Sequence, residues 1–503
     1  MSSAPPVAVR TENPSGDRFL QRVFSFPVML VGLLADLALL TVRSRFDDPD
    51  MWWHLKTGEI IWTTHTIPTT DLFSYTTGHH AYVAHEWLSQ VLLYGAYRFG
   101  GYSGLMLWLF FFTSALLIAG YGLCWLYSEN AKVGFLGALT IWLFGTIGFA
   151  IRPQMVGYLL LIFELILIQL GRTRNPRWFF GLPLLFAIWV NCHGSFFLGL
   201  IVAAVFLFSS LFDFRMGSLV SIRWEPRCRQ MLMLALVLSV AALFINPIGV
   251  KQILYPLDAM LHLPLNLSEV SEWQPLQLVD GRGLAFMGMI GCIFLLVLAR
   301  QSELLWHELL ILALGIWLAT GHRRMLFPFG ILAAPVLSRM LGRHWDGYQP
   351  EKDRPWPNAV LIAASVAVAF LAFPNRQNLT RQVNENSPVK AVEFIQSHHL
   401  LGRMLNEYKY GGYLIWAAPD HPVFVDGRGD IFELTGVLSE FGRWATLQTD
   451  PNQLLDKYRI DFCLLSHESP MAVVFPLLPD WKTIYSDDNS VIFAREPAKG
   501  SHK

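Results

Sequence analysis

The sequence is poor in charge. Charged residues make up 15% of its 503 residues, whereas a soluble globular protein carries about a quarter. The formal net charge is +0, so the bulk charge points to neither nucleic acid nor an acidic partner. Hydrophobic residues make up 53%, and the mean hydropathy is +0.39. Together these values predict a protein that crosses a membrane several times.

Cysteine is also scarce, and the spacing of the five cysteines excludes a cysteine-based metal site. Most of them lie in or beside apolar runs, so they say little about the redox compartment. The chain lacks an internal repeat and a low-complexity segment. We expect no cleavable signal peptide, because the N-terminus is polar for about 22 residues and the following apolar run is too long.

Long apolar runs, by contrast, fill most of the chain. The hydrocarbon core of a bilayer is about 30 Å thick, which requires roughly 20 apolar residues per helix. We predict eleven transmembrane helices on this criterion, at residues 24–43, 105–127, 133–150, 155–170, 178–190, 194–212, 230–246, 284–300, 304–320, 325–341 and 357–374. The short fifth helix meets the sixth at Asn191–Gly194, as a tight hairpin or as a broken re-entrant pair.

Basic residues predict the orientation of these helices. Arg10, Arg18 and Arg22 precede the first one and place the N-terminus in the cytoplasm. With eleven crossings, every strongly basic short loop also falls inside: Lys132, then Arg172, Arg174 and Arg177, then Arg215, Arg223, Arg227 and Arg229, then Arg300, then Arg339, Arg343, Lys352 and Arg354. The outer face receives the loop 44–104, the Asn191–Gly194 turn, the loop 247–283 and the tail.

The predicted fold is an α-helical polytopic membrane protein with a C-terminal soluble α/β domain. We expect a disordered cytoplasmic N-terminus over residues 1–22, a transmembrane domain over 23–375 and an extracytoplasmic domain over 376–503. The tail alternates strand-like runs with helical patterns, which is typical of an α/β unit. The strand-like runs are Arg403–Tyr408, Pro422–Asp426, Asp461–Ser466 and Val491–Arg495.

The first outer loop begins with a candidate site. Asp48-Pro49 predicts a helix start, with Asp as the N-cap and Pro at the first helical position. A helix from there places four residues on one face: Asp50, Trp53, His54 and Thr57. A carboxylate and an imidazole one turn apart suit binding and proton abstraction. The alternative interpretation is a capping aspartate beside an interfacial belt of aromatic residues.

The rest of this loop is equally rich in polar groups. Asp71 follows, and His85-Glu86 precedes an amphipathic stretch to about Phe99 that is too short to span and is predicted to lie along the interface. The acids of the loop are Asp47, Asp48, Asp50, Asp71 and Glu86, and its histidines are His54, His65, His79, His80 and His85. A loop of about 60 residues without a function is unusual.

Three arginines lie at predicted outer helix ends, against the usual distribution of charge: Arg152 and the adjacent pair Arg323-Arg324. Such cations suit a lipid phosphate, and snorkelling anchors are the alternative. Asn191 and His193 line a cavity or form a structural turn.

Other polar groups are open to two interpretations as well. Asp36 and Glu164 are acids inside predicted spans and therefore functional candidates, unless they reach the interface from near the inner ends. In the tail, Asp426-Gly427-Arg428-Gly429-Asp430 follows a strand-like run. It is either a ligand loop or a turn closed by an internal Asp–Arg pair.

The run DDPDMWWHLKTGEII, followed by IPTTDLFSYT and HEWL, resembles the first outer loop of bacterial multi-pass glycosyltransferases of the GT-C superfamily. This superfamily includes the oligosaccharyltransferase catalytic subunit, protein O-mannosyltransferases and the lipid A aminoarabinose transferase. The chain resembles another bacterial branch more closely than these enzymes. The resemblance covers most of the chain and extends through Arg152–Gln154, Trp189–Gly194, Asn246–Gly249, Tyr410–Tyr413 and Val425–Arg428.

The resemblance implies an inverting transfer on the extracytoplasmic side of a bacterial inner membrane. A sugar leaves a polyprenyl-phosphate donor for a lipid, glycan or protein acceptor. Asp50 or Asp48 would deprotonate or orient the acceptor, with Glu86 as a second acid. From the residues themselves we predict the following substrate-binding side chains: His54, His85, Asp71, Arg152, His193, Arg323 and Arg324.

A divalent cation, Mg²⁺ or Mn²⁺, is a further candidate, since some family members need one and Asp48 and Asp50 offer oxygen ligands. The chain departs from the family in two ways. It has no adjacent Asp-Glu pair in the first loop and no Trp-Trp-Asp signature in the tail. Both departures leave the acceptor class open.

Two other function classes remain as alternatives. A transporter or flippase for a lipid-linked substrate also needs acids within spans and outer arginines, but it predicts a pseudo-symmetric repeat that is absent from the sequence. A non-catalytic scaffold subunit would keep the fold and use the tail for contacts with other proteins.

Overall fold

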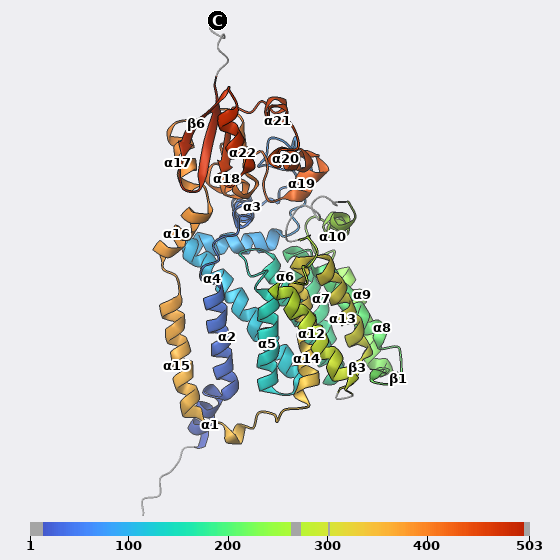
Figure 1. Ribbon diagram of the computed structural model, residues 1–503. Coiled ribbons are helices and arrows are strands. Elements are labelled where there is room, and N and C mark those ends of the chain that lie inside the picture. Colours follow the sequence, from blue (N-terminus) through green and yellow to red (C-terminus); the bar gives the residue numbers. More distant parts are fainter. Residues whose placement is uncertain (1–13, 263–272, 300–301, 497–503) are drawn as a thin grey trace, which may run out of the picture.

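The computed structural model describes residues 14–262, 273–299 and 302–496. Figure 1 shows a helical bundle with a smaller α/β unit, built from the tail, stacked on one end of it. The bundle helices are α1 Pro14–Val23, α2 Phe26–Val42, α3 Met51–Thr64, α4 Trp87–Ser128, α5 Ala131–Gly145, α6 Gln154–Thr173, α7 Gly181–Cys192, α8 Phe196–Ser209, α9 Pro226–Ala242, α10 Val250–His262, α12 Gly281–Leu298, α13 Trp306–Gly321, α14 Leu326–Gly342 and α15 Pro355–Ala372.

Each of the eleven predicted spans overlaps one of these helices. Within the described residues, six helices are long and apolar enough to cross a membrane, and three shorter apolar helices accompany them. The predicted fold class, a multi-pass membrane protein with a C-terminal α/β unit, is confirmed. The number of crossings stays a prediction, and two of the arginines on which it rests, Arg10 and Arg300, lie outside the described residues.

The helices differ in how much of their apolar surface is covered. Helices α6 and α14 are buried for most of their length, and α14 packs against α4, α5 and α13. Helices α12 and α15 lie at the periphery and leave most of their apolar side chains uncovered, including Phe370 and Leu371. An apolar helix that is exposed on most sides is stable in lipid rather than in water.

Two expectations for the N-terminal part need correction. Disorder over residues 1–22 is wrong for the described part, because Pro14–Val23 forms α1, which starts with a proline at a helix N-terminus and has Arg22 in its last turn. Residues 1–13 lie outside the described residues. The helix predicted to start at Asp48-Pro49 instead starts at Met51, with Asp50 as the flanking N-cap residue. Asp48 closes the preceding turn by accepting a hydrogen bond from the Asp50 N–H, 2.9 Å long.

Helix α4 contains both the amphipathic stretch and the second predicted span. Gly101 separates the two with a backbone φ of 55° and ψ of −140°, a conformation that favours glycine. In Figure 1 the part before Gly101 runs across the top of the bundle, and the part after it descends through the bundle.

The tail forms an α/β unit around one sheet with strand order β4-β5-β7-β6. Strands β4 and β5 are parallel, and the β5–β7 and β7–β6 pairs are antiparallel. Its elements are α16 Arg376–Asn386, α17 Val389–Ser397, β4 Met404–Asn406, α18 Gly411–Ala417, α19 Gly429–Leu434, α20 Val437–Ala445, α21 Pro451–Lys457, β5 Phe462–Ser466, α22 Pro470–Val474, β6 Trp481–Ser486 and β7 Ser490–Arg495.

The run Pro422–Asp426, predicted as a strand, is not part of this sheet. Val423 instead forms an isolated parallel bridge with Ser74 of the first outer loop. The apolar pattern is therefore satisfied by a segment of the bundle, and the tail is tied to the first loop.

Candidate active site

The candidate site lies where the tail unit meets the top of the bundle. Five segments that are far apart in the sequence contribute to it: residues 48–54 at the start of α3, residues 85–90 at the start of α4, the turn before α6, the turn before α14 and the tail loop 426–430. The Asn191–Gly194 junction between α7 and α8 closes it from below.

Arg152 holds the two aspartates that precede α3. Its Nε lies 2.5 Å from Asp48 Oδ2, and its Nη2 lies 3.0 Å from Asp50 Oδ2. The Asp50 side chain is 19% exposed and that of Asp48 only 6%. Asp50 is therefore the more accessible carboxylate of the pair.

The predicted pair Arg323-Arg324 divides between two environments. Arg324 reaches the start of α6, where it donates to Gln154 Oε1, and its guanidinium lies 5.4 Å from the centre of the Trp273 ring. Arg323 faces the charge of Arg282 on α12 instead. The turn before α14, Arg323–Met325, thus brings one arginine toward Arg152 and turns the other away.

Glu86 lies at the centre of three histidines. Its carboxylate oxygens are 3.4 Å from His193 Nε2, 3.7 Å from His85 Nε2 and 3.7 Å from His54 Nδ1. The Ser195 N–H donates to His193 Nδ1, so the neutral His193 ring carries its proton on Nε2, toward Glu86. These distances are contacts rather than good hydrogen bonds, and they leave Glu86 available to a substrate.

Burial decides the charge of this cluster. It raises the pKa of Glu86 to about 8, although the positive charges of Arg324 and Arg152 act in the opposite direction. Burial also lowers the pKa of His85 to about 4 and holds the pKa values of His54 and His193 well below the usual range. At neutral pH the cluster is therefore an uncharged acid among uncharged imidazoles.

The tail loop reaches this cluster through Asp430. Tyr255 of α10 donates a hydrogen bond of 3.0 Å to Asp430 Oδ2. The Tyr255 ring stacks on His85, with 4.0 Å between the ring centres. Sequence analysis missed Tyr255, because the loop around it carries no motif and only the fold brings it to His85.

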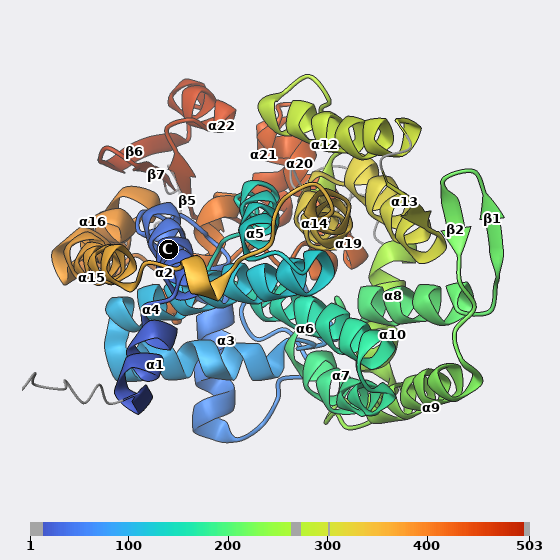
Figure 2. The same cartoon turned by 90° about the horizontal axis from the view of Figure 1, so that it is seen from below.

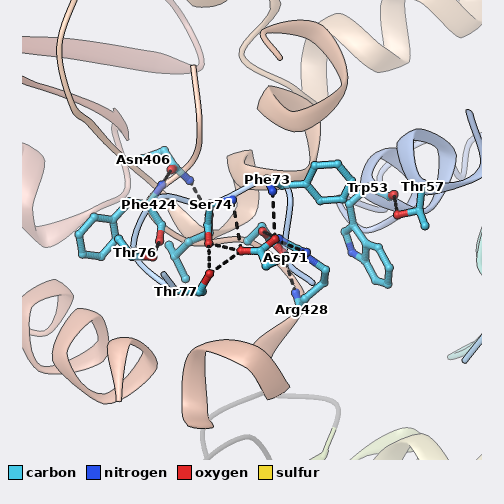
Figure 3. A network of polar contacts seen from close by, with 12 residues as sticks. Trp53, Thr57, Asp71, Phe73, Ser74, Thr76, Thr77, Asn406, Phe424 and Arg428 are labelled. Atoms are coloured by element: carbon cyan, nitrogen blue, oxygen red, sulfur yellow. Dashed lines mark hydrogen bonds and ion pairs between the residues drawn. The ribbon is translucent and has the colours of Figure 1, made fainter. Parts of the chain in front are cut away.

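A second part of the tail loop clamps the first outer loop. Arg428 Nη1 lies 2.7 Å from Asp71 Oδ1, and Arg428 Nη2 lies 2.6 Å from Asp426 Oδ2. Ser74 and Thr77 donate to the other oxygen of Asp71, as Figure 3 shows. Burial alone would raise the pKa of Asp71, but Arg428 and these hydrogen bonds outweigh it and lower the pKa.

Asp71 is therefore a structural residue. It is completely buried and both of its oxygens accept hydrogen bonds within the protein, so its role in substrate binding stays a prediction that this packing does not favour. The tail motif is a turn closed by the pair Asp426–Arg428, as one of the two interpretations of the sequence had it. The third member of this ion cluster, Asp71, is more than 350 residues distant in the sequence.

Glycines allow the tail to approach α3. A Cβ atom on Gly427 would lie 1.8 Å from Asp50 Oδ1, and one on Gly412 would lie 2.2 Å from the Pro49 carbonyl oxygen. No Cβ atom fits at such distances, so the glycines of both tail motifs are needed for this packing. Gly427 therefore fixes one side of the Asp50 carboxylate.

The acids predicted inside spans do not join the site. Glu164 is buried halfway along α6, and neither of its oxygens has a hydrogen-bond partner within the described residues. Asp36 lies on α2, across from Ser365 of α15.

The donor set does not fit a divalent cation. Among the residues that the structure describes, no group of three or more His, Cys, Asp or Glu side chains is placed to hold a metal ion. Asp48 and Asp50, the predicted ligands, share Arg152 between them, and its guanidinium would repel a cation.

An apolar cavity of about 1080 Å³ opens beside the site. Its walls come from α3, α4, α7 and the turn after α9, and include Trp62, Ile67, Trp87, Val91 and Ile245. Trp87 Nε1 donates to Asn191 Oδ1 at 2.8 Å, which places one wall of the cavity next to the His193 turn. Asn191 is thus part of both a structural turn and a cavity wall.

No protein-family model matches the chain, and neither does any curated protein sequence. Two solved structures of the oligosaccharyltransferase from Archaeoglobus fulgidus are similar to it. The apo form has 13% sequence identity and a TM-score of 0.51, over 93% of this chain and 74% of that chain. The form tethered with an acceptor peptide containing the NVT sequon has 12% identity and a TM-score of 0.51, over 95% and 76%.

A third structure, ArnT from Cupriavidus metallidurans in the apo state, has 13% identity and a TM-score of 0.48, over 96% of this chain and 98% of that chain. At 12–13% identity, the likeness to the two oligosaccharyltransferase structures concerns the fold alone, and the predicted resemblance is confirmed as a resemblance of fold.

Proposed function

We propose that this protein is a membrane glycosyltransferase. It moves a sugar from a polyprenyl-phosphate donor to an acceptor outside the cell, with inversion at the anomeric carbon. The observation that carries the proposal is the convergence of Asp50, Arg152, Arg324 and Glu86 at one end of a bundle with the fold of an oligosaccharyltransferase. The similar oligosaccharyltransferase structure that is tethered with an acceptor peptide supports transfer to an acceptor.

In this proposal, two arginines bind the phosphate of the donor. Arg324 approaches from the turn before α14, and Arg152 approaches from the turn before α6. Hydrogen bonds from guanidinium groups to phosphate are of the strong, charge-assisted kind. In this role Arg324 neutralises the charge that develops on the leaving polyprenyl phosphate.

Asp50 is the base in this proposal. The acceptor oxygen forms a bond to the anomeric carbon while the bond from that carbon to the phosphate oxygen breaks, and the polyprenyl phosphate leaves with the electron pair. The proton of the acceptor hydroxyl goes to Asp50. Asp48 is less suited because it is more buried and already accepts the Asp50 N–H. Glu86 carries a proton at neutral pH and donates a hydrogen bond to the substrate rather than acting as a base.

The apolar cavity supports a lipid-linked substrate. Its lining includes no Asp, Glu, Lys or Arg side chain within the described residues, and its volume of about 1080 Å³ leaves room for a hydrocarbon chain. A chain seated there keeps its polar end beside Asn191 and His193.

The test is product release by the full-length protein. Purified protein is incubated with polyprenyl-phosphate sugars and candidate acceptors, and free polyprenyl phosphate is measured together with the anomeric configuration of the product. Release with inversion supports the proposal. Movement of an intact lipid-linked sugar across a vesicle membrane, without release of the carrier, would replace it with the flippase, and neither outcome with any donor would favour the scaffold.

A further inference from the structure

A second cavity, with several polar residues in its lining, lies at the end of the bundle opposite to the tail unit. It has a volume of about 40 Å³ and is lined by residues of α6, α8, β2 (Leu219–Ser221) and α13, among them Arg172, Ser209, Ser221, Trp306 and His307. The small sheet β1-β2-β3 borders it, with β1 at Phe214–Met216 and β3 at Leu304–Leu305. Figure 2 looks onto this end and shows the β1–β2 hairpin beside α8.

Arg172 contributes a positive charge that no carboxylate balances within the described residues. Its Nη2 donates to Gln169 Oε1 at 2.8 Å, and its Nη1 lies 3.0 Å from His307 Nε2. A guanidinium has only donors, so His307 accepts this hydrogen bond and is itself uncharged.

Two other arginines at this end of the bundle differ from Arg172, because each of them has a carboxylate partner. Arg339 pairs with Glu308 at 2.6 Å, and Arg215 pairs with Glu303 at 2.7 Å. Both have a carboxylate partner, and neither lines the cavity. Arg172 therefore combines a wall position with an uncompensated charge.

A second donor in the same wall is unused. Trp306 Nε1 is buried and has no hydrogen-bond partner within the described residues. Trp306 is also the first residue of α13, a helix of 16 residues whose N-terminus is already capped by Glu308, which accepts the Leu305 N–H. A buried N–H without a partner costs free energy, which a ligand with acceptor oxygens would recover.

We propose that this cavity binds a phosphate group. A volume of about 40 Å³ has room for about three water molecules or for one tetrahedral oxyanion. Arg172 supplies the charge, Trp306 supplies an N–H, and the walls carry no acid. The phosphate is either part of the headgroup of an anionic phospholipid or free inorganic phosphate, because the site contacts only the oxyanion.

The position in the fold suits a lipid headgroup. Arg174, Arg177 and Arg223 are exposed around this end, and the charge pattern predicts that it faces the cytoplasm. Basic pockets between transmembrane helices on that side attract anionic headgroups. Helix α6 joins this site to the candidate active site over about 30 Å, with Arg172 in its last turn and Arg152 just before its first. The site is therefore independent of the proposed sugar transfer.

Delipidated full-length protein in a neutral detergent provides the test. Binding is measured by native mass spectrometry against phosphatidylglycerol, phosphatidylcholine and inorganic phosphate. We expect phosphatidylglycerol to bind in preference to phosphatidylcholine, and Arg172→Gln to weaken it about ten- to a hundredfold, as expected for loss of a charge-assisted contact. Trp306→Phe keeps an aromatic side chain but removes the five-membered ring of the indole together with its N–H, so a weakening of about three- to tenfold is expected even if Arg172→Gln fails to fold.

Arg177→Gln is the matched control, because Arg177 is exposed and does not line the cavity. Its affinity for phosphatidylglycerol should stay within about twofold of the wild type. If inorganic phosphate binds with the same dependence on Arg172 and the lipid does not, the site stands and free phosphate is its ligand. Equal losses in Arg172→Gln and Arg177→Gln, no effect of Trp306→Phe, or no binding of either phosphate source would overturn the proposal.

Discussion

Two aspartates two positions apart take different roles in this site. Asp48 is buried, caps a turn and pairs with Arg152, whereas Asp50 shares the same arginine and keeps part of its carboxylate accessible. A base needs access to the acceptor hydroxyl as well as a negative charge. The difference in exposure therefore favours Asp50 over Asp48 as the base, a choice that the sequence left open.

The variant Asp50→Asn should lower transfer at least a hundredfold and leave donor affinity within about twofold. Asparagine keeps the volume and removes only the base, and general-base catalysis contributes about a hundred- to ten-thousandfold. Release of polyprenyl phosphate gives kcat, and a donor-binding assay gives the affinity. Asp47→Asn is the control, since Asp47 is exposed and should keep its activity. Full activity in Asp50→Asn together with loss in Asp48→Asn would move the base to Asp48.

Glu86 sets the expected pH dependence. Its pKa is raised to about 8, so the donating form is present below that pH and is lost above it. Transfer should fall as pH rises through about 8, and Glu86→Gln, which cannot ionise, should flatten this limb of the kcat profile. A Glu86→Gln variant that is inactive at every pH would instead make Glu86 a base.

The raised pKa of Glu86 should also make the free energy of unfolding depend on pH. Between the unfolded pKa of 4.5 and the folded pKa of about 8, the folded state holds a proton that the unfolded state has lost. The free energy of unfolding of the protein therefore decreases as pH rises through this window. Thermal unfolding should show a smaller decrease for Glu86→Gln than for the wild type.

At the scale of elements, the tail loop 426–430 is a part of the site and not an appendage to it. Gly427 touches Asp50, Asp430 reaches His85 through Tyr255, and Arg428 anchors the loop on Asp71. A short segment of the tail thus positions groups on α3 and α4. The catalytic geometry depends on docking of the tail.

The variant Gly427→Ala tests this positioning. Its Cβ would meet Asp50 Oδ1 at 1.8 Å, so Asp50 must move. We expect kcat to fall at least tenfold while donor affinity changes by less than about threefold, because a small displacement of a reacting group costs rate more than binding. In Gly442→Ala, the control, the added Cβ meets nothing within 4 Å. Equal activities of both variants would show that the loop does not position Asp50.

The Arg428 clamp has a larger expected effect on stability. Arg428→Met would leave Asp71 and Asp426 buried without a cation, and breaking a buried ion pair on one side costs about 3–5 kcal/mol. Limited proteolysis and thermal unfolding should both show a loosened tail. Arg443→Met, at an exposed position of α20, should change neither. A wild-type unfolding temperature in Arg428→Met would contradict the clamp.

For the whole molecule, the prediction concerns topology. Reporter fusions after residue 375 should be extracytoplasmic, and fusions within 171–177 and 213–229 should be cytoplasmic, because the strongly basic loops lie there. The candidate site then faces outward, where a translocated lipid-linked donor is available. A cytoplasmic tail would overturn the count of eleven crossings and the side of the proposed reaction.

Local patterns in the sequence were sufficient for the helices and for part of the site. Each apolar run of the predicted spans overlaps a helix, since length and hydropathy are properties of consecutive residues. The acidic first loop and Arg152 could be singled out for the same reason, because unusual charge near lipid is visible in the sequence itself. The Asp426–Arg428 pair is equally local, because the two residues are two positions apart in the sequence.

Partner choice between distant segments was decided only by the tertiary structure. Asp71 looks as available as Asp50 in the sequence, yet packing of the tail buries it against Arg428, more than 350 residues away. Arg323 and Arg324 are neighbours, yet the turn before α14 directs only Arg324 to Gln154. Hydropathy and helical period depend on residues a few positions apart, whereas an ion pair or a close glycine contact depends on distances that exist only after the segments have packed.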